Sequence, residues 1–113
     1  MGDKKIRGGA LVARALKDKG IDNVFTLSGG FCNPALEGFM ECQINVINCP
    51  HEQIAGHLAD GHTRISRKPS VCIVGPEGFA NAVPSMMEAW GERSPVIFIT
   101  GSSSLKRQGA GGF

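Results

Sequence analysis

The sequence has little net charge, no apolar run of membrane-spanning length and no repeating unit. Its 113 residues carry a formal net charge of +2, which is too small to indicate a nucleic-acid partner. A membrane-spanning helix needs about 20 consecutive apolar residues, and no stretch approaches that length. The absences predict a single globular domain whose partners include neither nucleic acid nor a membrane.

Cysteine pairs of the C-x-x-C type are also absent. The four cysteines stand apart in the chain, at positions 32, 42, 49 and 72. No secretory leader is recognisable before them. This usage predicts reduced thiols in a cytoplasmic protein. Cys72 lies in an apolar run and is expected in the core, whereas Cys32 follows a glycine turn and is a candidate for facing a ligand.

Several common site motifs are missing as well. The glycine-containing segments 28–31 and 75–78 match neither the dinucleotide fingerprint nor the P-loop, and no serine has a G-x-S-x-G setting. The zinc motif H-E-x-x-H starting at His51 would need its second histidine where Ala55 stands. No metal ligand is therefore predicted in this chain.

Helix-like and strand-like segments alternate along the chain. Apolar periodicity predicts helices over 8–19, 34–42, 51–65 and from about 81, with strands over 24–27, 44–47, 71–74 and 96–99. Asn81 is expected to cap the last helix, with Pro84 in its first turn. The alternation predicts an α/β fold with a parallel sheet flanked by helices. The glycine-rich segment after the last strand suggests that the domain, 1–113, is incomplete.

Residues 51–62 are the most informative segment. Glu52 stands where a strand ends and a helix begins, and ligands bind at the carboxyl ends of strands in open α/β sheets. Two interpretations are open: a carboxylate that stabilises the helix N-terminus, or an acid that acts on a cofactor. Spacing alone favours the first.

The order of four segments changes that balance. They are Gly9 to Leu16, Val24 to Gly30, His51 to Arg64, and Pro95 to Gly101. Together they resemble the N-terminal pyrimidine-binding domain of thiamine-diphosphate enzymes of the acetolactate synthase, 2-hydroxyacyl-CoA lyase and benzaldehyde lyase type. The resemblance covers about Gly8 to Phe113, nearly the whole chain.

This resemblance implies a catalytic role for Glu52. In the family, the matching glutamate hydrogen-bonds the N1′ atom of the aminopyrimidine and favours its imino tautomer, so that the ring can activate the thiazolium carbon. The carboxyl group must then be protonated near neutral pH, which burial favours and the helix N-terminus opposes.

The resemblance also implies the remaining site residues. The expected cofactor-binding residues are Gly29, Gly30, Gly75, Pro76 and Asn81, and the expected active-site lining is Phe31, Cys32 and Phe113. The sequence departs from the family in the turn over residues 74–78, which is one residue shorter and adds the acid Glu77, and at His62, which replaces a common tyrosine.

The implied partners lie outside this chain. The diphosphate and Mg²⁺ would be held by a pyrophosphate-binding domain or subunit, and the intact enzyme would be a dimer or tetramer that makes or breaks a C–C bond next to a carbonyl. Its substrate would be a small 2-oxo acid or a 2-hydroxyacyl compound, and the isolated chain is expected to be inactive. Two alternatives are a separate pyrimidine-binding subunit of a two-chain decarboxylase and a non-catalytic module with the same fold.

Overall fold

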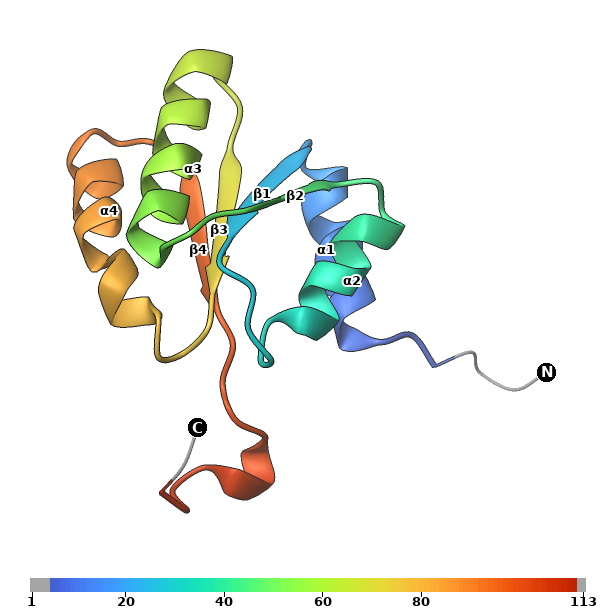
Figure 1. Cartoon of the computed structure of the whole chain (residues 1–113). Helices are drawn as coiled ribbons and strands as arrows, with labels where there is room; N and C mark the ends of the chain where they lie inside the picture. The colour runs from blue at the N-terminus through green and yellow to red at the C-terminus, as the bar shows by residue number, and fades with distance from the viewer. Residues whose placement is uncertain (1–4, 112–113) are drawn as a thin grey trace.

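The computed structural model describes residues 5–111, which form alternating helices and strands (Figure 1). The elements are α1 (Gly8–Asp18), β1 (Asn23–Thr26), α2 (Asn33–Glu41), β2 (Asn45–Asn48), α3 (Glu52–Ser66), β3 (Ser70–Val74), α4 (Phe79–Gly91), β4 (Val96–Thr100) and the short 3-10 helix η1 (Leu105–Arg107). The eight predicted helices and strands are all present. No helix among the described residues has the length and apolar character needed to cross a membrane.

The four strands form one parallel sheet in the order β2-β1-β3-β4. Val24 pairs with Val46 of β2 on one side and with Val71 of β3 on the other. From β1 the chain first adds β2 on one side, then returns across β1 to add β3 on the other. The carboxyl ends of β1 and β3 therefore flank the point where the strand order reverses, which is where ligands bind in such sheets.

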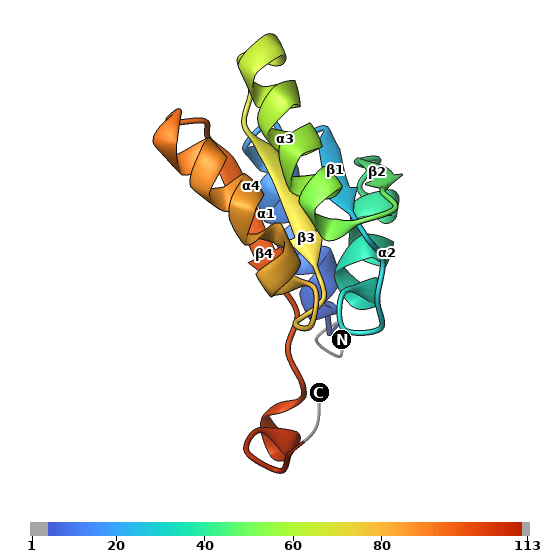
Figure 2. The same ribbon diagram turned by 60° about the vertical axis from the view of Figure 1, so that its left-hand side comes forward.

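Helices cover both faces of the sheet, giving three layers (Figures 1 and 2). The helices α1 and α2 pack together on one face, and α3 and α4 pack together on the other. Alternate strand residues point to the two faces, so Val71 joins the α1–α2 core and Cys72 the α3–α4 core. Cys72 is fully buried, which confirms its predicted place in the core. Burial, with the neighbouring thiols of Cys49 and Cys32, raises the pKa of Cys72 to about 12.

Helices α3 and α4 face the sheet in an unusual way for helices that cover one. The large apolar side chains of these helices point outward; they are Ile54, Leu58 and Ile65 on α3 and Val83, Met87 and Trp90 on α4. Small residues face inward instead, and a Cβ built at Gly56 of α3 would lie 2.5 Å from Cβ of Ser85 on α4. Because the two helices approach this closely, only small side chains fit between them and the sheet.

The start of α4 also differs from the prediction. Gly78 is the N-cap residue, so Asn81 lies inside the first turn rather than at the cap. Pro84 consequently lies in the helix interior rather than in the first turn. Because proline has no amide hydrogen, the helix lacks one backbone hydrogen bond at this position. The earlier start turns the Asn81 side chain toward α3, with consequences for the site.

Candidate functional site

The candidate site lies at the carboxyl ends of the strands. Since all four strands are parallel, the loops after β1, β3 and β4 and the first turn of α3 all reach this edge of the sheet. The loop after β1 approaches the end of β4, because a Cβ built at Gly101 would lie 2.7 Å from Cβ of Phe31. The fold thus brings together segments separated by up to about 70 positions in the sequence.

Glu52 is the first residue of α3, and His51 fixes the helix start. The Nδ1 atom of the His51 ring accepts a hydrogen bond from the Gln53 amide at 3.1 Å, so this histidine serves as the N-cap. The Glu52 side chain is only 14% exposed, although it belongs to a helix end. The sequence located this acid correctly but did not predict the cap.

Two residues of the β3–α4 segment hold the Glu52 side chain. Nδ2 of Asn81 donates a hydrogen bond to Oε2 of Glu52 at 3.1 Å. The Glu52 side chain also lies directly on Gly78, where a built Cβ would be 2.6 Å from its Cγ. Gly78 has an ordinary negative φ, so its lack of a side chain matters for space rather than for backbone freedom. The one sequence feature that could have indicated this contact is Gly78, the glycine directly before the helix that carries Asn81.

The glycine turns after β1 and β3 face each other across Glu77. A Cβ built at Gly75 would lie 2.9 Å from Oε1 of Glu77, and one built at Gly29 would lie 3.9 Å from the same atom. Gly75 is buried and Pro76 partly so, while Gly30 is exposed. The predicted cofactor-binding residues of both turns therefore lie at one edge of the sheet, with Glu77 between them.

The predicted lining residues have different environments. Phe31 is exposed beside the end of β4, whereas Cys32 is only 1% exposed and so lies beneath the surface rather than lining it. Burial raises the pKa of the Cys32 thiol, a hydrogen bond from the Gly101 amide opposes this, and the Glu77 carboxylate adds to the rise. The thiol therefore stays neutral. Phe113 lies outside the described residues.

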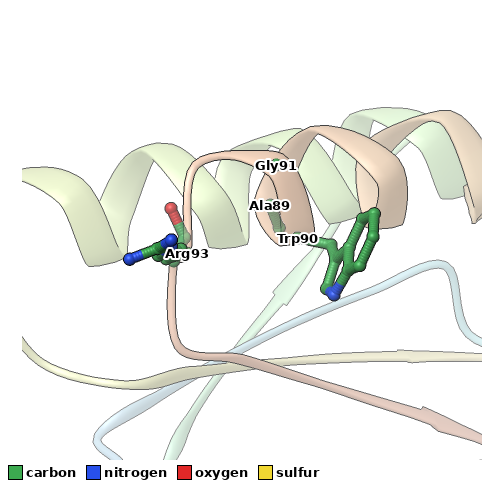
Figure 3. Close-up of a pocket in the computed structure, with 5 residues that line it drawn as sticks. Ala89, Trp90, Gly91 and Arg93 are labelled. Carbon is green, nitrogen blue, oxygen red and sulfur yellow. The ribbon is translucent and has the colours of Figure 1, made fainter.

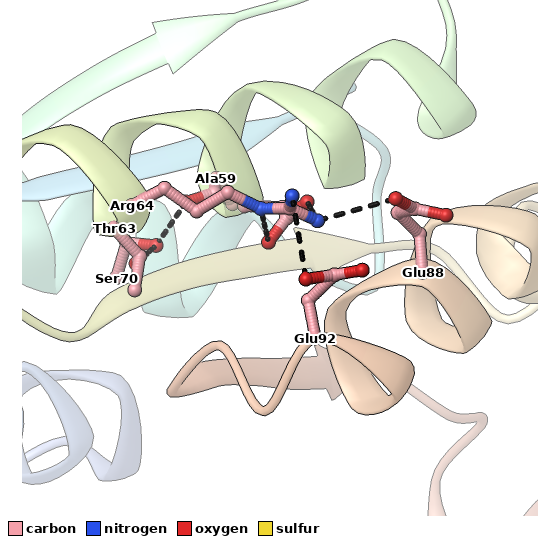
Figure 4. Close-up of polar contacts among 7 residues, drawn as sticks. Ala59, Thr63, Arg64, Ser70, Glu88 and Glu92 are labelled. Atoms are coloured by element: carbon pink, nitrogen blue, oxygen red, sulfur yellow. Dashed lines mark hydrogen bonds and ion pairs between the residues drawn. The ribbon is translucent and has the colours of Figure 1, made fainter.

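The other ends of α3 and α4 carry a network of ion pairs (Figure 4). Arg64 pairs with the nearly buried Asp60 at 2.8 Å, with Glu88 at 3.2 Å and with Glu92 at 3.9 Å. Burial alone would raise the pKa of Asp60, but hydrogen bonds from Arg64 and Ser94 outweigh it and lower that pKa. This network links the two helices at the amino ends of the strands.

Buried hydroxyl groups reinforce the same end. Ser70 donates a hydrogen bond to the carbonyl oxygen of Ala59 at 2.6 Å, and its hydroxyl lies 2.6 Å from that of Thr63 (Figure 4). Both hydroxyls are almost fully buried. The first residue of β3 is thereby tied to the middle of α3.

A surface hollow lies remote from Glu52. It has a volume of about 540 Å³ and is lined by Ala89, Trp90, Gly91, Arg93 and Ser94, at the end of α4 (Figure 3). We assign the candidate site to the carboxyl edge regardless, because that edge gathers the glycine turns and a nearly enclosed carboxyl group. A hollow without an acid or base held in place offers less chemistry.

The chemistry available at the carboxyl edge is proton exchange by a held carboxyl group. One oxygen of Glu52 accepts from Asn81, and the other lies beside the Gly78 backbone. Between residues 5 and 111, no group of three or more His, Cys, Asp or Glu side chains is placed to hold a metal ion. The site therefore suits a ligand that exchanges a proton with one acid and fits against glycine turns.

Comparison with known families identifies a match along almost the entire chain. Residues 6–113 match the model of the thiamine pyrophosphate enzyme family, N-terminal TPP binding domain. The matched region contains all the elements of the sheet and the whole candidate site.

Two curated relatives illustrate the range of similar proteins. The acetolactate synthase large subunit IlvG of Mycobacterium tuberculosis is 38% identical over 108 residues, which are 94% of this chain and 20% of that protein. The 2-hydroxyacyl-CoA lyase 2 of Danio rerio is 35% identical over 106 residues, 92% of this chain and 17% of that protein. The chain thus spans about a fifth of the length of these relatives.

A solved structure agrees with the fold. A putative thiamin diphosphate-dependent enzyme from Mycobacterium smegmatis superimposes with a TM-score of 0.84 at 21% identity, over 98% of this chain and 21% of that one. At this identity, the likeness concerns the arrangement of helices and strands.

Proposed function

This chain belongs to the thiamine pyrophosphate enzyme family as an N-terminal TPP binding domain, and we propose that its carboxyl edge binds the cofactor's aminopyrimidine with Glu52 as catalytic acid. One observation carries the proposal. The Glu52 carboxyl group is 14% exposed, held by Asn81, and lies on Gly78, where a side chain would displace it. A structural helix-end carboxylate requires neither the enclosure nor the glycine.

The residues present fit the pyrimidine half of the cofactor. When bound, thiamine diphosphate supplies an electron sink for making or breaking a bond next to a carbonyl. The chain supplies the proton. Asn81 fixes Oε2 of Glu52, which leaves Oε1 to exchange a proton with a ring nitrogen.

The glycine turns complete the proposed binding edge. Gly29 and Gly30 present backbone to the ligand without side chains, Gly75 and Pro76 form the facing turn, and Phe31 offers an apolar surface beside the first turn. We assign Phe113 to the same lining from the family resemblance. Residues 1–113 are proposed to be the N-terminal portion of this domain.

The rest of the catalytic unit is proposed to come from other parts. A pyrophosphate-binding domain or subunit would hold the diphosphate and Mg²⁺, and the assembled enzyme would be a cytoplasmic homo-oligomer. Its reaction would form or cleave a C–C bond next to a carbonyl in a 2-oxo acid or 2-hydroxyacyl substrate. The names of the relatives support this range of reactions.

The direct test is Glu52→Gln in an enzyme reconstituted from this chain and a pyrophosphate-binding partner. Glutamine keeps the size and can still accept from Asn81, but it cannot transfer the proton. We expect the turnover rate to fall by about 10²–10⁴-fold, measured under saturating thiamine diphosphate and Mg²⁺.

Asp18→Asn is the matched control. It makes the same carboxyl-to-amide change at an exposed position at the end of α1 and should leave turnover unchanged. Undiminished activity in Glu52→Gln would show that Glu52 is not the cofactor acid.

A further inference from the structure

Glu77 is an exposed acid in the turn between β3 and α4, and the described residues supply no ion pair for it. Seven of the eight acidic side chains between residues 21 and 100 have an ion pair or a side-chain hydrogen bond; they are Asp22, Glu37, Glu41, Glu52, Asp60, Glu88 and Glu92. Glu77 is the eighth, and within residues 5–111 no basic side chain lies within 4.0 Å of its carboxylate.

The position of Glu77 is specific. Its side chain folds back over Gly75 and reaches toward Gly29, so the carboxylate lies between the two glycine turns. The next residue, Gly78, supports Glu52. The two acids therefore contact the two ends of one short turn, Glu77 at Gly75 and Glu52 at Gly78, with Glu52 largely enclosed and Glu77 exposed.

The Glu77 charge also acts on its surroundings. It contributes to the raised pKa of the buried Cys32 thiol behind the first turn. A carboxylate that disfavours a neighbouring negative charge equally favours a positive one. Neither glycine turn supplies a cation to satisfy it.

We propose that Glu77 is a specificity-determining residue that pairs with a positively charged group of the bound ligand, beside the aminopyrimidine held at Glu52. The inference rests on the proposed function, because it takes Glu52 as the pyrimidine contact. Two groups have this chemistry: the cationic thiazolium ring, which one methylene joins to the pyrimidine in thiamine, and a guanidinium or ammonium group on a 2-oxo acid substrate. A sulfonate or second carboxylate on the substrate would be repelled.

The experiment compares binding of charged and neutral ligands to the full 113-residue chain by isothermal titration calorimetry. The first pair is thiamine and its neutral pyrimidine half, the hydroxymethyl-substituted aminopyrimidine. The second pair, titrated with the pyrimidine half present at saturation, is a guanidinium-bearing 2-oxo acid and a neutral 2-oxo acid of equal length. Each pair is measured with the wild type, Glu77→Gln and the control Asp18→Asn.

The expected result is a loss of charge preference in Glu77→Gln alone. For at least one pair, the wild-type preference for the cation should fall by about fivefold, a typical effect for a partly exposed ion pair, and the pair that responds identifies the source of the charge. The wild-type preference should also weaken with added salt. A merely structural role would change charged and neutral ligands equally.

Two outcomes would overturn the proposal separately. If the pyrimidine half binds but Glu77→Gln leaves both preferences unchanged, the role of Glu77 is wrong and the proposed function of Glu52 survives. If the pyrimidine half does not bind the wild type, the proposed function fails, and the inference about Glu77 fails with it.

Discussion

The two ends of the α3–α4 pair differ in how completely their polar groups are satisfied. At the amino ends of the strands, Arg64 forms ion pairs with Asp60, Glu88 and Glu92. At the carboxyl ends, Glu52 has a single amide donor, and the Glu77 carboxylate has no cation near it within the described chain. The same two helices thus carry an ion-pair network at one end and carboxylate oxygens with few partners at the other.

The difference separates stability from function within one helix pair. A saturated network contributes to folding and offers nothing to a ligand, because its donors and acceptors are already used. Acids with one partner or none, next to glycine turns, contribute little to folding but leave groups for a ligand to pair with. Changes at the amino ends of the strands should therefore alter the free energy of unfolding, and changes at the carboxyl ends should alter ligand affinity.

The largest expected effect on the stability of the fold comes from Ser70→Ala at the amino end. Removal of the hydroxyl loses its bond to the Ala59 carbonyl and leaves the buried Thr63 hydroxyl short of a partner. We expect the free energy of unfolding to fall by about 2 kcal/mol, measured by urea denaturation. The affinity of the folded chain for the pyrimidine half of thiamine should stay the same.

The matched control is Ser104→Ala, which removes an exposed hydroxyl that makes no capping bond. Its effect on unfolding should stay within about 0.5 kcal/mol. A clear change in ligand affinity for Ser70→Ala would erase the distinction between the two ends.

The next effect is Gly78→Ala at the carboxyl end. The added methyl group would overlap the Glu52 side chain and force it away from Asn81, so we expect affinity for the pyrimidine half to fall about tenfold. The free energy of unfolding should fall by at most about 1 kcal/mol, since alanine is a poorer N-cap than glycine.

Gly91→Ala is the control on the same helix, because a Cβ there meets nothing within 4 Å. It should leave ligand affinity unchanged. Equal binding by Gly78→Ala and wild type would mean that the Glu52 position has no role in the site.

The smallest effect is the acid dependence that comes from Asp60. Its pKa in the folded chain is lowered from the ordinary value of 3.8, so its stabilising contribution is complete above pH 3.8 and is lost as pH falls through the lower folded pKa. Urea denaturation at neutral pH and below pH 3.8 should therefore show a shallower loss of stability in Asp60→Asn than in wild type.

The exposed pair of Asp22 with Lys17 is the internal comparison. Hydrogen bonding and charge from Lys17 also lower the pKa of Asp22. Since this pair is exposed, added salt should reduce its contribution more than that of Asp60. An identical acid profile in wild type and Asp60→Asn would show that the buried pair adds nothing.

The sequence was sufficient to predict the alternating α/β fold and the place of Glu52. Apolar strands such as 71–74 are distinctive because both of their faces are covered, and an acid directly after a strand is placed by the topology. The parallel sheet, the strand positions within one or two residues and the family were all confirmed.

The facing of the helices and the support of Glu52 could not be read from the sequence. Periodicity marks an apolar stripe but does not say whether large or small residues face the sheet. Large apolar residues usually face the sheet, but in α3 the close approach to α4, where Gly56 contacts Ser85, leaves room only for small ones. Asn81 was predicted as a cap because asparagine is a common N-cap residue. Its actual partner, Glu52, is 29 positions earlier in the sequence and becomes its neighbour only through packing.

The return of the chain across β1 has a consequence for protein synthesis. β1 pairs with β3 through Val24 and Val71, so the central strand pair cannot form until both partners have left the ribosome. Glu52 is made well before Gly78 and Asn81, the residues that hold its carboxyl group. A nascent chain that ends before α4 can carry the acid but cannot orient it, and the site becomes competent only when the second half of the sheet folds against the first.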